Sequence, residues 1–361
     1  MKMKLAICTR DEVYAARMID YFSIHFSDRM ELSQYTEIAY LADALKIERP
    51  DICLIGDELL EEIEGTEAEK KNIAVLTEEK DAVYENKKSI FKYQKAELIY
   101  KELLNLYADF KSNAAVFREH NEKEAYSYAF LSPMGGTGAT TVALAYATYL
   151  AKTRNVLYVS LQQYSNAEVV LHGEGNGKFD DVIFALKSKR GALAMKLESL
   201  VRHNKDNVSF FETCDNPLDL QELTEEEVQR LLREFIQSGL YQDVIIDIDS
   251  QLHGLEKTVL KEVEHIIVVA NGDRSNEEKL NKFHTAMESL EEQEGVSLLY
   301  KTRLFYNKYS NKTSEDASGN LFKVIGGIAK FEGVQMEGIV TRMALMDGLG
   351  EILKLESGAN E

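Results

Sequence analysis

Cysteine, positive charge and long apolar runs are all scarce in this chain of 361 residues. The three cysteines, Cys8, Cys53 and Cys214, lie far apart, and the first two sit in apolar runs where a buried thiol is expected. This spacing favours neither a disulfide framework nor a metal site. Lysine and arginine total 42 against 61 aspartates and glutamates, a net charge of −19, so we expect no nucleic-acid partner.

Segments that could enter a membrane are also lacking. No stretch approaches the ~18 apolar residues that span a bilayer, and the apolar run at residues 5–8 is too short for a signal peptide. Residues 342–355 are amphipathic, but two glycines and few cations make them a poor membrane anchor, and a last helix packed on the fold is the better interpretation. We therefore expect a cytoplasmic protein without direct membrane insertion.

Two series of strands and helices follow one another along the chain. In residues 1–108 we expect strands at 4–8, 32–35, 51–55, 73–77 and 89–93, and helices at 12–26, 38–47 and 95–108. Residues 109–126 are polar and are expected to form a linker, and a second series begins at Tyr128. We predict two α/β domains, at 1–108 and 127–361, each a doubly wound, mostly parallel sheet with helices on both faces.

The most informative stretch joins an apolar strand to a helix through glycines. Gly135, Gly136 and Gly138 follow the strand, and a helix starts near Thr140. Glycines adopt backbone angles closed to other residues, so consecutive amides can point inward and form a nest for phosphate oxygens. The helix start adds free amides and its positive dipole end, and Thr140 stands where a hydroxyl would meet Mg²⁺. The pattern predicts a nucleotide phosphate site, with a tight turn that binds no ligand as the alternative.

A second apolar strand, at residues 241–249, ends in carboxylates. In a parallel sheet Asp247 would lie at the carboxyl edge of this strand, beside the glycine loop. There it could hold Mg²⁺ through water, which makes Asp247 and Thr140 the candidate metal residues. A helix cap or a solvated carboxylate is the alternative for Asp247.

The loop and this strand together resemble the ParA/MinD superfamily of P-loop ATPases. Within it the chain is most similar to the TadZ/CpaE proteins of Tad (Flp) pilus assembly, which carry a receiver-like (flavodoxin-like) domain ahead of the ATPase domain. The resemblance covers nearly the whole chain and implies ATP and Mg²⁺ as cofactors. It implies that Asn307 contacts the adenine and that the strand end at 326–330 lies beside the base. The nucleotide-binding residues that it implies are Met134, Gly135, Gly136, Thr137, Gly138, Ala139, Thr140, Thr141, Asp247, Asn307, Ile328 and Lys330.

The departures from the superfamily pattern concern charge. Ala139 and Met134 stand at the positions of its two loop lysines, and Ser160 and Gln162 at those of the aspartates that end the second strand. Phosphoryl transfer depends on charge stabilisation and a positioned water. We therefore expect nucleotide binding with very slow or absent hydrolysis, and assign no catalytic residue. Asp249 is a possible substitute carboxylate.

The first domain resembles a response-regulator receiver that has lost its phosphoacceptor. The strand at 50–56 would end in the acceptor aspartate, and that position is Gly56. Asp57 follows, but a slip of one residue turns a strand side chain to the other face. The positions of the metal-binding acidic pair hold Thr9 and Arg10.

Two other receiver positions are retained, since Thr77 and Lys92 match the switch hydroxyl and lysine. Ordinary strand-end residues are the alternative for both. Without an acceptor, the domain is interpreted as a pseudo-receiver, a protein-interaction module.

Several functions remain open at this point. The first is a nucleotide-binding scaffold for pilus assembly. The resemblance implies a homodimer through the ATPase domain, pilus machinery components bound through the receiver-like domain, and a place at the cell pole or the inner face of the membrane through partners. The alternative is an active MinD/ParA-type positioning ATPase that cycles with ATP hydrolysis. The acidic charge and missing lysines disfavour a DNA-partitioning protein, and Gly56 disfavours a conventional response regulator.

Overall fold

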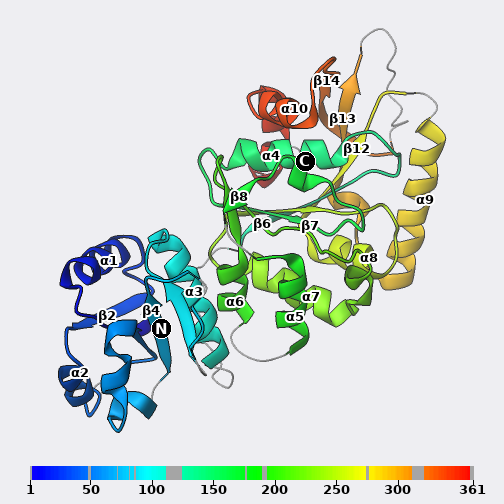
Figure 1. The fold of residues 1–361 in the computed structure, drawn as a ribbon. Coiled ribbons are helices and arrows are strands. Elements are labelled where there is room, and N and C mark those ends of the chain that lie inside the picture. The colour runs from blue at the N-terminus through cyan, green and yellow to red at the C-terminus, as the bar shows by residue number, and fades with distance from the viewer. Residues whose placement is uncertain are drawn as a thin grey trace. The chain divides into compact units, whose positions relative to one another are not determined.

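Two compact units make up the chain, Met1–Glu119 with Lys189–Ser199, and His120–Ser188 with Leu200–Glu361 (Figure 1). The computed structural model describes residues 2–47, 50–70, 72–80, 82–84, 87–110, 124–174, 177–188, 193–273, 276–310 and 321–357. Most of the linker predicted at 109–126 lies outside these described residues.

A five-stranded parallel sheet in the order β2-β1-β3-β4-β5 forms the centre of the first unit. Its strands are β1 (Met3–Cys8), β2 (Met30–Tyr35), β3 (Ile52–Gly56), β4 (Ile73–Thr77) and β5 (Lys88–Phe91). The helices in this part of the chain are α1 (Glu12–His25), α2 (Ile38–Ala44) and α3 (Ala96–Phe110). Every residue of β3 and β4 is buried, as in inner strands of a parallel sheet, and Cys8 and Cys53 are buried thiols. The predicted α/β architecture is confirmed.

Apolar side chains cover both faces of this sheet. Helices α1 and α3 pack on one face and α2 on the other. Residues 193–199 of helix α6 (Leu193–Leu200) also belong to this unit, although they lie far along the chain. Met195 packs against the core beneath α1 and α3, and Arg29 forms an ion pair with Glu198. Nothing in the sequence pattern indicated this addition.

A nine-stranded sheet in the order β14-β13-β12-β6-β11-β7-β10-β9-β8 forms the centre of the second unit. Its strands are β6 (Tyr126–Leu131), β7 (Val156–Ser160), β8 (Gly173–Glu174), β9 (Arg202–Asn204), β10 (Val208–Phe210), β11 (Asp243–Asp247), β12 (His265–Ala270), β13 (Thr302–Tyr309) and β14 (Lys323–Ala329). Only the pairings of β9 with β10 and with β8 are antiparallel, so the predicted mostly parallel sheet is confirmed.

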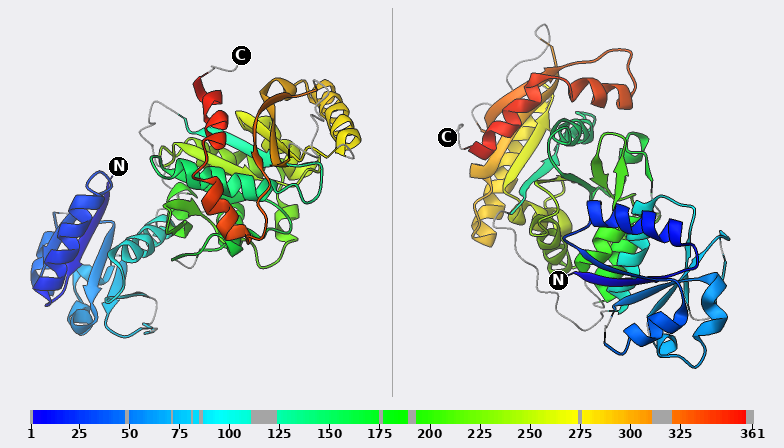
Figure 2. Two further views of the ribbon diagram at one scale, coloured as in Figure 1. Left: turned by 90° about the horizontal axis from the view of Figure 1, so that it is seen from above. Right: turned by 90° about the vertical axis from the view of Figure 1, so that its left-hand side faces the viewer.

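Helices lie on both faces of the nine-stranded sheet (Figure 1). The helices are α4 (Ala139–Leu150), α5 (Phe179–Ser188), α7 (Glu225–Ile236), α8 (Gly254–Glu262), α9 (Glu277–Glu294), α10 (Met336–Met343) and α11 (Gly350–Leu353). Helices α4, α10 and α11 share one core with the sheet, and Figure 2 shows α9 at the edge near β13. Among the described helices, none has the length and apolar character needed to cross a membrane.

The C-terminal segment packs on the fold, as predicted, although as short helices and not as one. Leu349, Ile352 and Leu355 are buried in the core beneath α4. Glu356 accepts hydrogen bonds from Tyr128 of β6, at 2.8 Å, and from Arg154, at 2.7 Å. The segment is therefore bonded to β6, an inner strand of the sheet.

His265, the first residue of β12, is half-buried beside this cluster. Its ring lies 5.1 Å from the ring of Tyr128, and its Nε2 has no hydrogen-bond partner among the described residues. The charged groups that face it are Arg303, Lys301, Glu356 and Glu264. Burial, followed by the charge of Arg303, lowers the pKa of His265 from 6.5 to about 4.

This lowered pKa predicts a loss of stability in acid. Because the folded state holds His265 neutral, the unfolded state binds a proton first as pH falls from about 6.5 towards 4. The His265→Phe variant keeps an aromatic ring but cannot titrate. We expect the free energy of unfolding of the wild type to fall by about 2 kcal/mol relative to this variant between pH 7 and pH 4.5. Urea unfolding at both pH values measures the difference, and a constant gap would contradict the prediction.

Candidate functional site

The glycine loop between β6 and α4 has the backbone that a phosphate nest requires. Gly136 and Gly138 have φ angles of +76° and +87°, in the left-handed region that favours glycine. Gly138 is the residue directly before α4, so the free amides of the helix start face the loop. The sequence prediction of a strand, a glycine turn and a helix holds at each step.

Asn307, near the end of β13, holds this loop from the side. Its Nδ2 donates to the carbonyl oxygen of Thr137 at 2.8 Å, and both residues are buried. A Cβ added at Gly138 would lie 2.6 Å from the same Nδ2. Asn307 therefore contacts the glycine loop itself, and the absence of a side chain at Gly138 makes this close approach possible. Its expected contact with adenine stays a prediction.

Strand register places Asp247 beside the loop. Asp247 ends β11, and its backbone is opposite Phe130 of β6 and Ser160 of β7. The hydroxyl of Tyr158 donates to Asp247 Oδ2 at 3.0 Å. Two fully buried oxygens remain without a hydrogen-bond partner among the described residues, Oδ1 of Asp247 and Oγ of Ser160. Burying such atoms unpaired is costly, so an ordered water or a ligand is expected to bind them.

Burial also sets the ionisation of this carboxyl. Asp247 is fully buried, and desolvation raises its pKa to about 7, although the nearby hydroxyls of Thr140 and Tyr158 act in the opposite direction. A cation would restore the ionised form. Within the described ranges, no three His, Cys, Asp or Glu side chains gather as a metal site. Mg²⁺ commonly combines one carboxylate with ligand phosphates, and the carboxylate and hydroxyl oxygens here fit that pattern.

Thr140 and the loop after β7 are connected directly. The Thr140 hydroxyl donates to Gln162 Oε1 at 3.0 Å. The backbone N–H of Gln163 donates to Asp249 Oδ2 at 2.9 Å, so the ends of β7 and β11 are joined. Gln162 thus places a neutral amide beside Thr140.

The other predicted residues are spread over different environments. Met134 is buried, and its backbone N–H and carbonyl oxygen both bond the Ser132 hydroxyl. Ile328 is buried in the core that α4 shares with the sheet, whereas Lys330 is exposed, 4.0 Å from Glu332. The structure therefore brings the loop residues, Asp247 and Asn307 together. The residues that remain in the glycine loop or the first turn of α4 are Gly135, Ala139 and Thr141.

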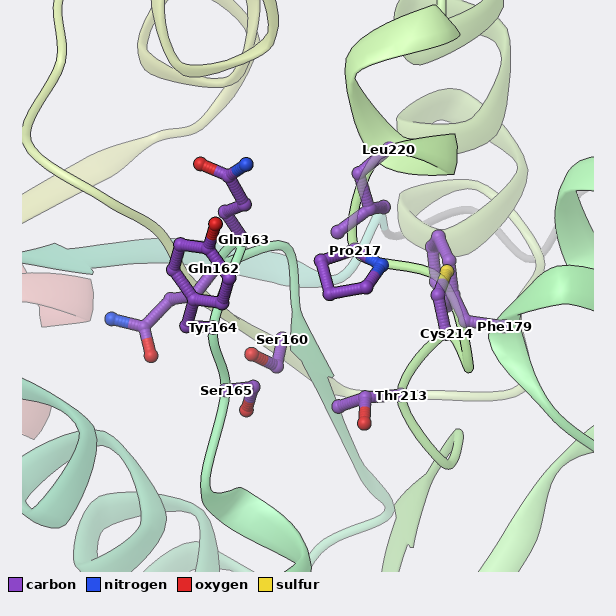
Figure 3. A pocket seen from close by; sticks show the side chains of 10 residues that line it. All are labelled: Ser160, Gln162, Gln163, Tyr164, Ser165, Phe179, Thr213, Cys214, Pro217 and Leu220. Carbon is purple, nitrogen blue, oxygen red and sulfur yellow. The ribbon is translucent and has the colours of Figure 1, made fainter.

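A pocket of about 180 Å³ opens next to Ser160 (Figure 3). Gln163 and Tyr164 form one side and Pro217 and Leu220 the other, while the Gln162 side chain points away from Pro217. A second pocket of about 420 Å³ shares Gln163 and Leu220 with the first. The two pockets therefore lie beyond the ends of β7 and β11, the first lined by Ser160 and the second by Asp249.

In the first unit, the phosphoacceptor position is filled by a different side chain. A Cβ added at Gly56 would lie 2.2 Å from the carboxylate of Glu58. That carboxylate accepts hydrogen bonds from the Thr9 hydroxyl, at 2.7 Å, and from the Arg10 backbone N–H, at 2.9 Å. Asp57 begins a 3-10 helix, outside the strand. The two positions predicted to have lost their acidic pair thus bind the carboxylate of Glu58.

The retained receiver residues bind other groups. Lys92 is buried and pairs with Asp11 at 2.7 Å and with Glu78 at 2.9 Å. The Thr77 hydroxyl lies 3.1 Å from the Tyr84 hydroxyl. Lys92 therefore forms its ion pairs with carboxylates outside the position of Gly56.

Sequence reasoning missed Tyr158 and Glu58. Tyr158 is a polar aromatic residue inside an apolar strand, two residues before Ser160, and that placement was the available signal. For Glu58 no signal existed, because its role depends on a side chain folding back over Gly56.

Alanine substitutions should distinguish a glycine that the loop conformation requires, Gly138, from one that it does not, Gly135. Gly138→Ala places a side chain at positive φ and against Asn307, so we expect a loss of about 1–3 kcal/mol in unfolding free energy. Gly135→Ala is the matched control, since its Cβ would meet no atom within 4 Å. Thermal unfolding of both variants measures the effect, and equal melting temperatures would contradict it.

The filled acceptor position predicts that the first unit does not accept a phosphoryl group. Incubation of the full chain with acetyl phosphate should leave its mass unchanged, because Gly56 has no carboxylate. Asp57→Asn serves as the comparison: an adduct on the wild type that disappears in this variant would show that Asp57 is an acceptor. Stoichiometric phosphorylation would contradict the pseudo-receiver interpretation.

Comparisons with known proteins agree with both halves of this description. A family model described as TadZ-like, receiver domain, matches residues 1–108. A ParA family ATPase from Chlorobium tepidum is 16% identical, with a TM-score of 0.50, and the match covers 62% of this chain and 98% of that one. The MinC:MinD cell division protein complex from Aquifex aeolicus gives 16% identity, a TM-score of 0.51, and coverage of 66% and 97%.

No curated protein matches the chain in the sequence comparison. The structural matches establish the fold of the second unit, and the family match identifies the first. Residues 1–108 therefore match a TadZ-like receiver domain, and the second unit has the fold seen in the solved ParA and MinD structures.

Proposed function

We propose that this chain is a nucleotide-binding scaffold protein of Tad (Flp) pilus assembly, which holds ATP and Mg²⁺ and hydrolyses ATP very slowly or not at all. The observation that carries the proposal is the pair of buried oxygens, Asp247 Oδ1 and Ser160 Oγ, left without partners beside the glycine loop. The TadZ-like domain and the ParA/MinD fold support a role in pilus assembly or positioning.

The backbone of the glycine loop would supply most of the contacts to phosphate. The amides of Gly136, Gly138 and the first turn of α4 are available because the two glycines have positive φ angles. Thr140 and Asp247 would hold Mg²⁺, directly or through water, which supplies positive charge at the phosphates when bound. Tyr158 orients the carboxylate of Asp247 through its hydrogen bond to Oδ2.

Slow hydrolysis follows from the groups beside that carboxylate. A positioned water needs a group that orients it, and transferring phosphate needs compensating charge. Ser160 and Gln162 are neutral, and Gln162 already accepts the hydrogen bond of Thr140. Met134 is buried and Ala139 has no charge. The chain would therefore still bind the nucleotide, although these four residues supply none of the charge that catalysis requires.

A homodimer through the ATPase unit, with pilus components bound through the receiver unit, completes the proposal. A protein that keeps its nucleotide can hold two copies together for long periods, which suits a marker of a cell pole better than a cycling enzyme. Docking on cytoplasmic partners would place it at the inner face of the membrane.

Nucleotide content and turnover test this function. The nucleotide extracted from purified protein should be mainly ATP, and the rate of ATP hydrolysis should stay well below ~1 s⁻¹, the low end for kinases. Sizing with and without Mg-ATP should show a dimer that Asp247→Ala weakens. Asp206→Ala, at an exposed turn, is the matched control. Rapid accumulation of ADP would favour a cycling ATPase, and failure to bind millimolar ATP would overturn the proposal.

A further inference from the structure

The glycine loop lacks both expected lysines, yet one lysine lies against it from another element. Lys308, next to last in β13, donates from Nζ to the carbonyl oxygen of Gly136. Gly136 is the residue before Thr137, whose carbonyl binds Asn307. Two consecutive residues of β13 therefore hold two consecutive carbonyls of the loop.

The backbone of Lys308 has a left-handed conformation, and its side chain reaches the glycine loop. Its φ angle is +59°, one of two positive values among the non-glycine residues described. The pairing of β13 with β14 shifts register between Asn307 and Tyr309, around this residue. The Asn307 side chain stabilises the conformation, because its Oδ1 accepts the Lys308 backbone N–H at 2.9 Å. Such strain persists only where the surroundings enforce it, and it concentrates at functional sites.

The ammonium group of Lys308 has capacity left for a ligand. An ammonium has three N–H donors, of which Gly136 takes one. The residue is exposed, and no carboxylate within the described part of the chain lies at ion-pair distance from it. In contrast, Lys330 on the adjacent chain segment lies near Glu332. In a chain of net charge −19, Lys308 is thus a cation available to the phosphate loop.

We infer that Lys308 is the phosphate-binding cation of this site, and that it replaces from β13 the lysine missing at Ala139. Its ligand is the phosphate chain of a nucleoside triphosphate, so the inference rests on the proposed function. On binding, Nζ donates a hydrogen bond to a phosphate oxygen, either in addition to its bond to the Gly136 carbonyl or in place of it. The bond to phosphate is strengthened because its two partners carry opposite charges. Lys308 and Asn307 are neighbours at the end of β13, and both contact the backbone of the glycine loop. The conformation of the loop therefore determines where the positive charge of Lys308 lies.

Titration calorimetry of the full chain with Mg-ATP tests this assignment. Lys308→Ala should weaken ATP binding by ~10-fold or more, the usual effect of losing a hydrogen bond to a charged group. Lys308→Arg should keep most of the affinity. Salt should weaken ATP binding less in Lys308→Ala than in the wild type, because one ionic contact is gone. Lys323→Ala, an exposed lysine at the start of β14, should bind as the wild type does.

Lys308→Gly guards against an effect on folding. Glycine accepts the positive φ without strain, so this variant should melt no lower than the wild type and still lose ATP affinity. If the wild type binds ATP and Lys308→Ala binds equally well, the assignment is overturned while the proposed function stands. Weaker binding with unchanged salt dependence and no rescue by arginine would also overturn it, because Lys308 would then only shape the loop. If the wild type itself binds no ATP, the proposed function fails and this assignment fails with it.

Discussion

The second unit depends on the register of three parallel strands. Because β11 lies between β6 and β7, the register of the three strands pairs Asp247 with Phe130 on one side and with Ser160 on the other. Asp247 therefore lies beside the end of β6, from which the glycine loop begins. A shift of one residue would turn Asp247 to the other face and remove the carboxylate from the loop. The register is fixed by a core that buries every residue of β7 and β11. Packing far from the loop therefore decides whether the site exists.

The sequence predicted those parts of the site that depend on local pattern. The glycines at 136 and 138, the strand that ends at Asp247 and the strand alternation in both units follow from short-range chemistry that a single sequence displays. The family of the first unit and the fold of the second agree with the resemblance carried by these motifs. Strand ends in a parallel sheet converge on one edge, so Thr140 and Asp247 could be paired without coordinates.

What the sequence did not predict depends on side-chain contacts between distant segments. The Tyr158 hydroxyl on Asp247 requires both residues to face the same side of neighbouring strands. The contact between Lys308 and the carbonyl of Gly136 requires a left-handed backbone at Lys308. No local sequence motif predicts that conformation for a lysine. Glu58 fills the space over Gly56 through a bend at the start of a 3-10 helix. Each is a tertiary outcome, for which spacing along the chain gives no rule.

Helix α6 has a practical consequence for anyone who isolates the receiver domain. The family match ends at residue 108, whereas the compact unit also takes residues 189–199. Cutting the chain after residue 108 would strip Arg29 and Tyr100 of the Glu198 carboxylate and expose the apolar surface under Met195. A fragment that ends where the family match ends would thus lack helix α6, which covers part of the core of this unit.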